Sequence, residues 1–452
     1  MAGKKIWNFV AAVVGGLAVI GVAAWQYNGQ QDTIDWEKVT DYPAKKAGEK
    51  KKVGEEKDIL QLQKVRYPKK DRWVSVDKAY LKNLKPFYQK SMSSLFLGKE
   101  GENCVYSPVN LYLSLAMLAE MTDGKTKSQL LDALGQKEIK KIREQSKLIW
   151  DSVYMDYGIS ECILGNSIWL NQDVPYQKEV LDTLAKQYYT ESYQGLMGAG
   201  MDQNIQDWVN DITKNILEEE AGEIKSTPEM AFILMSAAYF YDQWAEPFDN
   251  IATKKNIFIN ADGDKSECDF MNRTERGGVY KTERFQSTYL EFEGGSNMFL
   301  FLPEKDVTLE DLFRKDMEEI LHIASNFGIG FEEGGVSLSL PKFSMSSNLD
   351  LIPVMESMGI KDLFKKNEAD FTKLIGKEDK NCPPVFVNKM KQASNATVDE
   401  EGCYVASFTE TEVLMGAAGF KKIFKIVCDH PFFFVISDNN GIPVFAGAVN
   451  QL

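Results

Sequence analysis

Histidine is almost missing from this chain, since only His322 and His430 occur among its 452 residues. A hydrolase that pairs a serine or cysteine nucleophile with a histidine base would have to use one of these two. His322 lies in the amphipathic segment "EEILHIA", which predicts a helix surface or core edge. His430 precedes Pro431 in an extended corner, where we expect its ring to bond a backbone group. No G-x-S-x-G sequence occurs either, so the nucleophile elbow of α/β-hydrolases is missing.

Paired cysteines and an excess of positive charge are missing too. The six cysteines show no C-x-x-C pair and no metal-ligand spacing, which supports neither a zinc site nor a disulfide scaffold. An oxidising compartment would permit disulfides, but the sequence does not specify which cysteines would pair. The net charge of −14 would repel phosphate, so we expect no nucleic-acid partner. We also expect no metal, no cofactor and no catalytic residue, and thus no enzyme.

A long apolar run is present at the N-terminus. Residues 6–27 follow Lys4 and Lys5 and form an uncharged stretch of about 22 residues, long enough to span a bilayer. The lysines favour an N-terminus that stays in the cytoplasm. Residues 1–27 would be a signal peptide cleaved near Val22 and Ala24, or an uncleaved signal-anchor, which the length fits better. Either way we expect an extracytoplasmic protein, secreted or held at a membrane, and this topology suggests a bacterial surface.

The rest of the chain divides into a polar stretch and a folded domain. Residues 28–75 are dense in mixed charge, which predicts a linker or stalk. Residues 76–452 begin with helix-like apolar spacing, as in residues 78–97. Later segments alternate like strands, and residues 288–303 read as a hairpin with a Gly-Gly turn. The apolar run at residues 230–244 would suit a strand buried on both faces. We therefore predict an α+β domain with large, mainly antiparallel sheets.

One segment near the C-terminus alternates although its surroundings are typical of an exposed loop. Side chains of a strand point to opposite faces in turn, so residues 403–413 would have one small, uncharged face and one bulkier face with Glu410 and Glu412. The uncharged face consists of Cys403, Val405, Ser407, Thr409, Thr411 and Val413. The alternation ends in the sequence "GAAG" at residues 416–419.

Seven segments, in chain order and spread over residues 76–452, resemble the serpin family. They are "NCVYSPVNLYLSLAMLAEMTDGKTKSQLLDALG", "NSIWLNQDVPYQKEVLDTLAKQYY", "IQDWVNDITKN", "AAYFYDQWAEPFDNIATKKNIF", "LPKFSMSSNLDLIPVMESMGIKDLFKKNEADFTKL", "DHPFFFVI" and "PVFAGAVNQL". One such match would be weak, but seven in the family's order are specific. The resemblance implies the serpin fold, in which helices pack on large β-sheets and a reactive loop is exposed.

The resemblance also implies a function for the alternating segment. In serpins, a target serine protease cleaves the loop as bait, and the loop then inserts into the main sheet with the acyl-enzyme attached. We therefore expect a monomeric inhibitor whose partner forms a covalent acyl complex and supplies the catalytic serine. The implied hinge is Glu400, Glu401, Gly402, Cys403, Val405, Ser407 and Thr409. Small uncharged residues suit it, because an unpaired buried charge costs several kcal/mol.

The cleaved bond follows from the family's usual distance after the hinge. Counting from Glu400 favours Met415–Gly416, with Gly416–Ala417 as the alternative. The residues around these bonds are small or unbranched. They would suit a protease with a modest apolar pocket, such as an elastase-like or subtilisin-like enzyme.

The chain departs from the family at the gate for the loop, called the shutter below. Serpins generally carry a second serine after the Ser-Pro pair, an asparagine in the central strand and a histidine before the hinge. Here the corresponding residues are Ser107, Asn110, Ser236 and either Lys391 or Gln392. Serine and asparagine have exchanged places, which would keep one amide and one hydroxyl in the buried set. The histidine has no counterpart.

Two alternative functions remain. Val405 is bulkier than the alanine and threonine typical of inhibitory hinges, so slow insertion would make the chain a protease substrate or a non-inhibitory serpin. A more distant alternative is a cysteine hydrolase that pairs Cys403 or Cys428 with His430.

Overall fold

The computed structural model describes most of the predicted domain and two short segments before it. For residues 13–16 and 78–81 it describes only the backbone. The described residues are 13–16, 59–68, 75–76, 78–99, 101–157, 160–376, 384–402 and 422–452.

Helices form where apolar residues recur at helical spacing, as predicted for residues 78–97. The second helix begins with Pro108, which suits a first helical position because its missing N–H would have no partner there. The α-helices are α1 Lys78–Phe96, α2 Pro108–Met121, α3 Gly124–Ala133, α4 Ile139–Val153, α5 Lys178–Tyr188, α6 Ala199–Thr213, α7 Glu218–Gly222, α8 Leu309–Lys315, α9 Met317–Ala324, α10 Ile352–Ser357 and α11 Thr372–Ile375. Short 3₁₀ turns, η2 Asn250–Ala252 and η3 Asp362–Phe364, lie in connections.

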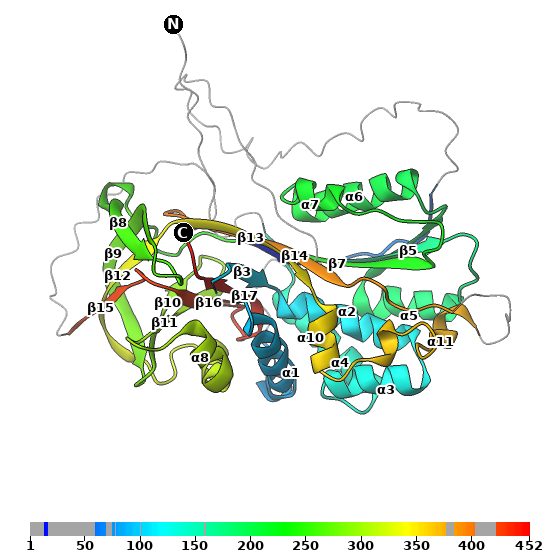
Figure 1. Ribbon diagram of the computed structural model, residues 1–452, viewed down its shortest axis with the longest axis horizontal. Coiled ribbons are helices and arrows are strands. Elements are labelled where there is room, and N and C mark those ends of the chain that lie inside the picture. Colours follow the sequence, from blue (N-terminus) through cyan, green and yellow to red (C-terminus); the bar gives the residue numbers. More distant parts are fainter. Residues whose placement is uncertain are drawn as a thin grey trace, which may run out of the picture.

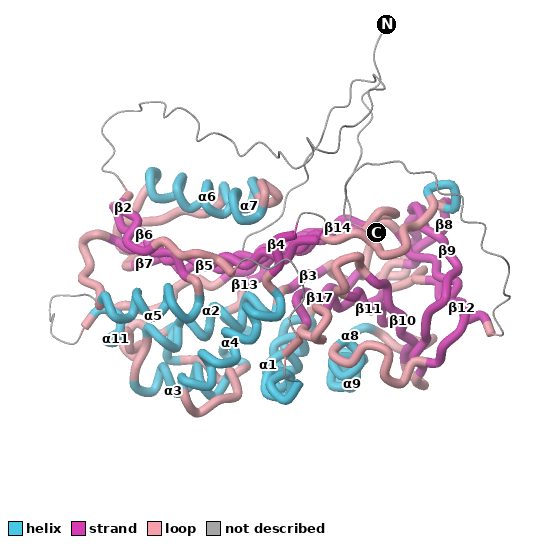
Figure 2. The backbone as a smooth tube through the Cα atoms, turned by 180° about the vertical axis from the view of Figure 1, so that it is seen from behind, coloured by secondary structure: helices cyan, strands magenta, loops and turns pink. Residues whose placement is uncertain are grey.

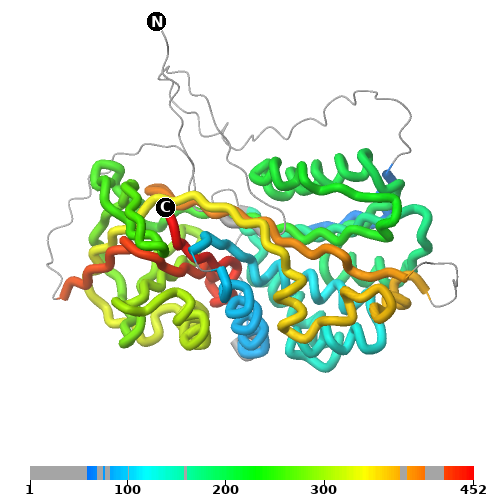
Figure 3. Tube along the Cα trace, viewed as in Figure 1, coloured from blue at the N-terminus to red at the C-terminus, as the bar shows by residue number. Residues whose placement is uncertain are grey.

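The main sheet carries the candidate site. Its strands lie in the order β13 Phe343–Asp350, β14 Lys391–Val398, β1 Val13–Gly16, β7 Phe232–Tyr241, β5 Ser160–Asn171, β6 Thr190–Gly195 and β2 Leu60–Gln63, and β4 Met155–Tyr157 pairs with β5. All pairs are antiparallel except β5 with β6. In Figure 3, the yellow β13 and the orange β14 run side by side along the sheet. The apolar run predicted as a buried strand is β7, the inner neighbour of β5.

A second sheet is formed mostly by the C-terminal half. Its order is β15 Ile423–Val427, β12 Glu332–Pro341, β9 Lys265–Lys281, β10 Phe285–Glu291, β11 Asn297–Pro303, β16 Phe432–Ser437, β17 Pro443–Val449 and β3 Cys104–Tyr106, and β8 Lys254–Ile259 pairs with β9. The predicted hairpin is confirmed as β10 and β11, joined through Gly294 and Gly295. In this sheet, only β12 and β15 are parallel among the described strands. The predicted α+β class with mainly antiparallel sheets is therefore confirmed.

Helices cover both faces of the main sheet. Figures 1 and 2 show α6 and α7 on one face and α2 to α5 on the other. Trp169, Met201, Ile205 and Trp208 form a separate apolar cluster beneath α6, while the larger core lies on the opposite side of the main sheet. The strands between these two cores are therefore buried on both faces, which explains their continuous apolar runs.

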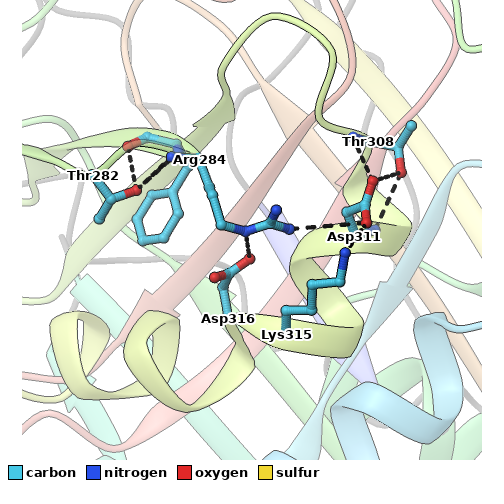
Figure 4. A network of polar contacts seen from close by, with 7 residues as sticks. Thr282, Arg284, Thr308, Asp311, Lys315 and Asp316 are labelled. Carbon is cyan, nitrogen blue, oxygen red and sulfur yellow. Dashed lines mark hydrogen bonds and ion pairs between the residues drawn. The ribbon is translucent and has the colours of Figure 1, made fainter.

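A polar network fixes the helices that support the second sheet. Figure 4 shows Arg284, in the turn between β9 and β10, pointing toward α8. Its Nε donates to Asp316 Oδ2 at 2.8 Å, and Lys315 Nζ donates to Asp311 Oδ1 at 2.8 Å. Thr308 and Asp311 also form a capping box at the start of α8. The network joins a strand turn to two helices.

Part of the stretch predicted as a stalk lies on the domain. Strand β2 pairs with the edge strand β6, and Gln63 Nε2 donates to Asp182 Oδ1 at 2.7 Å. Tyr67 stacks on Trp150 and Tyr154 at centroid distances of 5.9 and 5.8 Å. Within the residues that the structure describes, no helix is long and apolar enough to cross a membrane. Apart from β1, the predicted signal peptide or anchor lies outside those residues.

Candidate functional site

The predicted hinge leaves the main sheet at the end of β14. Residues 399–402 form a turn after Val398, and the chain is described again from Lys422, just before β15. The intervening residues 403–421 lie outside the described residues. These include the predicted cleavage-site residues Met415, Gly416 and Ala417 and the hinge residues Cys403, Val405, Ser407 and Thr409. The described residues thus flank the predicted reactive loop, ending at Gly402 and resuming at Lys422.

Glu400 is the anchored residue of this turn. Its buried carboxylate accepts hydrogen bonds from Lys342 Nζ at 2.6 Å and from Thr253 Oγ1 at 2.7 Å. Its carbonyl oxygen accepts from the Phe248 backbone N–H at 2.8 Å. Burial alone would raise the pKa of Glu400, but the bonds from Lys342 and Thr253 outweigh it and lower the pKa. The carboxylate is thus held charged against the body of the domain.

Gly402 ends the turn in a conformation that requires glycine. Its φ of 89° lies in the left-handed region, and a Cβ there would overlap the backbone nitrogen of Trp244. Trp244 is buried, and its Nε1 donates to the Asp399 carbonyl oxygen at 2.9 Å. An isolated antiparallel bridge also joins Asp399 to Gly402. The hinge therefore packs closely against Trp244 before the loop begins.

Two buried carboxyl groups lie at the hinge end of the main sheet, one after each of β7 and β14. Burial raises the pKa of Asp242 to about 7, although Asp242 accepts hydrogen bonds from Gly294 N–H and Ser160 Oγ. Burial likewise raises the pKa of Asp399 to about 7, against a bond from the Glu401 N–H. The pKa of Glu401 is raised by burial and by Glu400. Sequence reasoning missed Asp242 and Asp399, because neither belongs to a motif with a chemical signature.

The position between β7 and β14, called the slot below, accepts a strand. Strand β1 lies there, antiparallel to both neighbours, with Val14 opposite Phe240 on one side and Ala396 on the other. Among the described residues, β7 and β14 are not paired with each other; each pairs with β1 instead. β7 and β14 are therefore separated at the position where the family resemblance predicts insertion of the reactive loop, and β1 fills that position over four residues.

The structure brings the predicted shutter residues together below the slot. Gln392 accepts a hydrogen bond from the Ser107 N–H at 2.7 Å and donates one to the Ser107 carbonyl at 3.1 Å. Ser107 Oγ donates to the Val444 carbonyl at 2.9 Å, and Asn110 Nδ2 donates to the Ser236 carbonyl at 3.2 Å. All four shutter side chains are buried. Lys391 is exposed, so Gln392 is the inward residue of the two alternatives.

The two residues of the hydrolase alternative that the structure describes are unsuited to nucleophilic catalysis. Cys428 is fully buried, and burial raises the pKa of its thiol far above the ordinary value. Both ring nitrogens of His430 are engaged, Nδ1 with Asp429 Oδ1 at 2.8 Å and Nε2 with the Pro303 carbonyl at 3.1 Å. The expectation that His430 bonds a backbone group is confirmed. Cys403, the other proposed nucleophile, lies outside the described residues.

Comparisons with known proteins agree with this geometry. The family model for serpins, described as serine protease inhibitors, matches residues 69–452. Serpin-ZXA of Oryza sativa subsp. japonica is 25% identical over 368 residues, covering 78% of this chain and 91% of that protein. Plasminogen activator inhibitor 1 of Neovison vison is 26% identical over 382 residues, covering 81% and 91%. The native structure of the thermophilic serpin tengpin covers 87% of this chain and 100% of its own, with 22% identity and a TM-score of 0.76.

The family match extends from just after the N-terminal strands to the C-terminus, and thus over the hinge, the slot and the shutter. The solved structure agrees in fold over a similar share of the chain. The predicted serpin fold is confirmed, and the chain belongs to the serpin family, whose members are in general protease inhibitors.

Proposed function

We propose that this chain inhibits a serine protease by suicide-substrate trapping, with the reactive loop inserting between β7 and β14. The target is an elastase-like or subtilisin-like enzyme that cuts at Met415–Gly416, and it remains bound as a covalent acyl complex. The site of action is outside the cytoplasm, with the chain secreted or anchored through its N-terminal apolar run. The observation that carries the proposal is the agreement between the register of the slot and the alternation of the loop.

The register of the hinge supports this agreement. The antiparallel bridge between Asp399 and Gly402 defines a ladder, and its continuation along β14 would put Cys403 opposite Val398 and Val405 opposite Ala396. Val398 and Ala396 are almost fully buried in the main core. Directly opposed residues of an antiparallel pair share one face of the sheet. The small, uncharged face of the loop would therefore enter the core, while Glu410 and Glu412 would lie on the other face.

Two buried hydroxyl groups beside the slot support the same register. Ser394 Oγ and Ser236 Oγ have no hydrogen-bond partner among the described residues. On the continued ladder, Ser407 would lie opposite Ser394, and Thr409 would lie opposite Gln392. Extending the register of β1 aligns Gln392 with Ser236 on the other side of the slot, so Thr409 would lie opposite Ser236 as well. A buried hydroxyl without a partner is unfavourable by roughly 1–3 kcal/mol. Insertion would bring a hydroxyl group next to each of these two serines. The resulting side-chain hydrogen bonds would stabilise the inserted state in addition to the backbone hydrogen bonds of the new strand.

The direct test is to mix the purified chain with pancreatic elastase, and in parallel with subtilisin, and to run a denaturing gel. A band at the summed mass supports trapping, and its disappearance with an active-site-blocked protease is the control. A clipped chain alone, with full protease activity, would contradict trapping and support the substrate alternative.

A matched pair of variants tests the face assignment. Ser407→Arg would place a charge on the buried face and should turn the inhibitor into a substrate, because the loop could not insert at this position. Glu410→Arg would place the same charge on the opposite face, where the continued ladder puts it opposite the exposed Lys391, and should retain most complex formation. Equal losses in both variants would contradict the predicted register.

A further inference from the structure

The chain's own N-terminal segment occupies the slot. Strand β1 pairs with β7 at four positions, from Val13 opposite Tyr241 to Gly16 opposite Ala238. On its other edge, Val13 lies opposite Thr397 and Val14 opposite Ala396. Backbone N–H and C=O groups at an open strand edge need partners, and β1 supplies them to both neighbours at once. The occupant of this position is thus a defined segment of the chain.

The positions that β1 fills in the slot are among the first that the inserting reactive loop would fill. On the ladder defined by Asp399 and Gly402, Tyr404 would lie opposite Thr397 and Val405 opposite Ala396. These are the partners that Val13 and Val14 already have. Both strands would run in the same direction, because each is antiparallel to β14. One backbone cannot occupy a sheet position that another backbone fills, so β1 and the inserted loop are mutually exclusive.

We propose that residues 13–16 are an intrachain competitor of the reactive loop, and that the loop inserts only after β1 has left the slot. This inference rests on the proposed function and adds a regulatory step to it. A strand of four residues forms fewer backbone pairs than a loop strand of about a dozen residues. Its occupancy therefore slows insertion and does not prevent it.

The connection to the rest of the domain allows β1 to leave. Residues 17–58 separate β1 from the described segment that contains β2. An extended chain reaches about 3.3 Å per residue, so this connection could reach on the order of 100 Å. The pairing of β2 with β6 thus leaves residues 13–16 free to enter or leave the slot.

The competitor belongs to the apolar run expected to insert into a membrane. A residue cannot lie in a bilayer and between β7 and β14 at the same time. Membrane insertion of residues 6–27, or their removal, would therefore empty the slot by mass action. Loop insertion is therefore slow while this run is free, and it is fast once the run is anchored or removed.

The test compares the full chain with two variants at one position. Val14→Pro removes a backbone N–H and should disfavour β1, whereas Val14→Ala keeps it and is the matched control. Hydrogen exchange of peptides covering β7 and β14 reports slot occupancy. We expect exchange at least about tenfold faster in Val14→Pro than in the parent or in Val14→Ala. Equal exchange in all three proteins would overturn the proposal.

Insertion itself is measured without relying on covalent trapping. Each protein is clipped in the loop with a low concentration of elastase, and the rate at which the clipped chain gains thermal stability is followed. Val14→Pro should insert several-fold faster, and so should the parent chain reconstituted in phosphatidylcholine vesicles. Equal insertion rates in Val14→Pro and Val14→Ala would overturn the competition, and an unchanged rate in vesicles would overturn the membrane coupling. A missing covalent complex would contradict only the proposed function.

Discussion

Lys342 Nζ lies 2.6 Å from Glu400 Oε2 and joins the residue between β12 and β13 to the hinge after β14. Thr253 binds the other oxygen of the same carboxylate. Glu400 is 5% exposed, so its charge depends on these two donors. These contacts hold the start of the predicted reactive loop against two segments of the domain, one at Lys342 and one at residues 248–253.

Glu400→Ala should destabilise the native protein by about 2 kcal/mol, because it removes two hydrogen bonds to a charged group and leaves Lys342 without its partner. Glu401→Ala is the matched control, since the neighbouring carboxylate has a raised pKa and lies beside Glu400 without sharing its donors. Urea unfolding measures both variants. A loss in Glu401→Ala as large as in Glu400→Ala would show that the contact with Lys342 is not what anchors the hinge.

Lowering the pH from about 8 to about 5 should raise the unfolding free energy of the protein. The pKa of Asp399 is raised from 3.8 to about 7, so the folded state favours its neutral form. The resulting stability is complete below about pH 4 and is lost as the pH rises through about 7, with a slope of at most about 1.4 kcal/mol per pH unit. The lowered pKa of Glu400 acts oppositely, since its contribution is lost only below its ordinary value of 4.5.

Asp399→Asn should therefore flatten the dependence of the unfolding free energy on pH over this interval. Asparagine keeps an oxygen that can accept from the Glu401 N–H. Asp242, whose pKa is also about 7, would retain part of the slope. Thermal denaturation of parent and variant in matched buffers from pH 5 to 8 checks this. Superimposable profiles would mean that Asp399 does not titrate in this range.

Gln392→Ala should destabilise the protein by about 2–4 kcal/mol. The change removes both hydrogen bonds to Ser107 and leaves its buried backbone N–H without this acceptor, while its carbonyl oxygen keeps the bond from the Leu111 N–H. Lys391→Ala, at the exposed neighbouring position, should stay within about 0.5 kcal/mol of the parent. Denaturant unfolding compares the two. If both variants unfold at the same denaturant concentration, the hydrogen bonds between Gln392 and Ser107 contribute nothing measurable to stability.

Tyr67→Ala should cost about 2 kcal/mol, because it removes a ring stacked on Trp150 and Tyr154. Tyr67→Phe keeps the ring and removes a buried hydroxyl that has no hydrogen-bond partner among the described residues, so it should be neutral or slightly stabilising. Melting temperatures of the two variants separate these effects. A loss in Tyr67→Phe equal to that in Tyr67→Ala would assign the effect to the hydroxyl.

Elements with a strong period were predictable from the sequence, because their burial is one-sided or complete over many residues. Helix α1, strand β7 and the hairpin of β10 and β11 lie where their patterns predict them. The family segments predicted a hinge that begins with residues 400–402, and the structure has a turn at these residues after β14. The sequence also identified the two alternatives for the missing histidine, but it could not choose between Lys391 and Gln392. That choice depends on a contact between residues 285 positions apart.

Strands β1 and β2 could not be predicted, for different physical reasons. Residues 60–63 alternate as "LQLQ", but four residues in a charged stretch give a weak signal, and β2 gains its pairing from the edge of β6. Residues 13–16 belong to an apolar run that suits a bilayer at least as well as a sheet. The raised pKa values of Asp242 and Asp399 depend on burial that only the folded chain creates.

The attachment of β2 to β6 determines at which end of the domain the N-terminal connection enters. Figure 2 places β2 at one end of the long axis and β8, β9 and β12 at the other, and β15, where the chain resumes after the bait, pairs with β12. The N-terminal connection thus joins the domain at the end opposite β15. On a copy anchored through its first residues, the β2 end of the domain would be the one next to the tether.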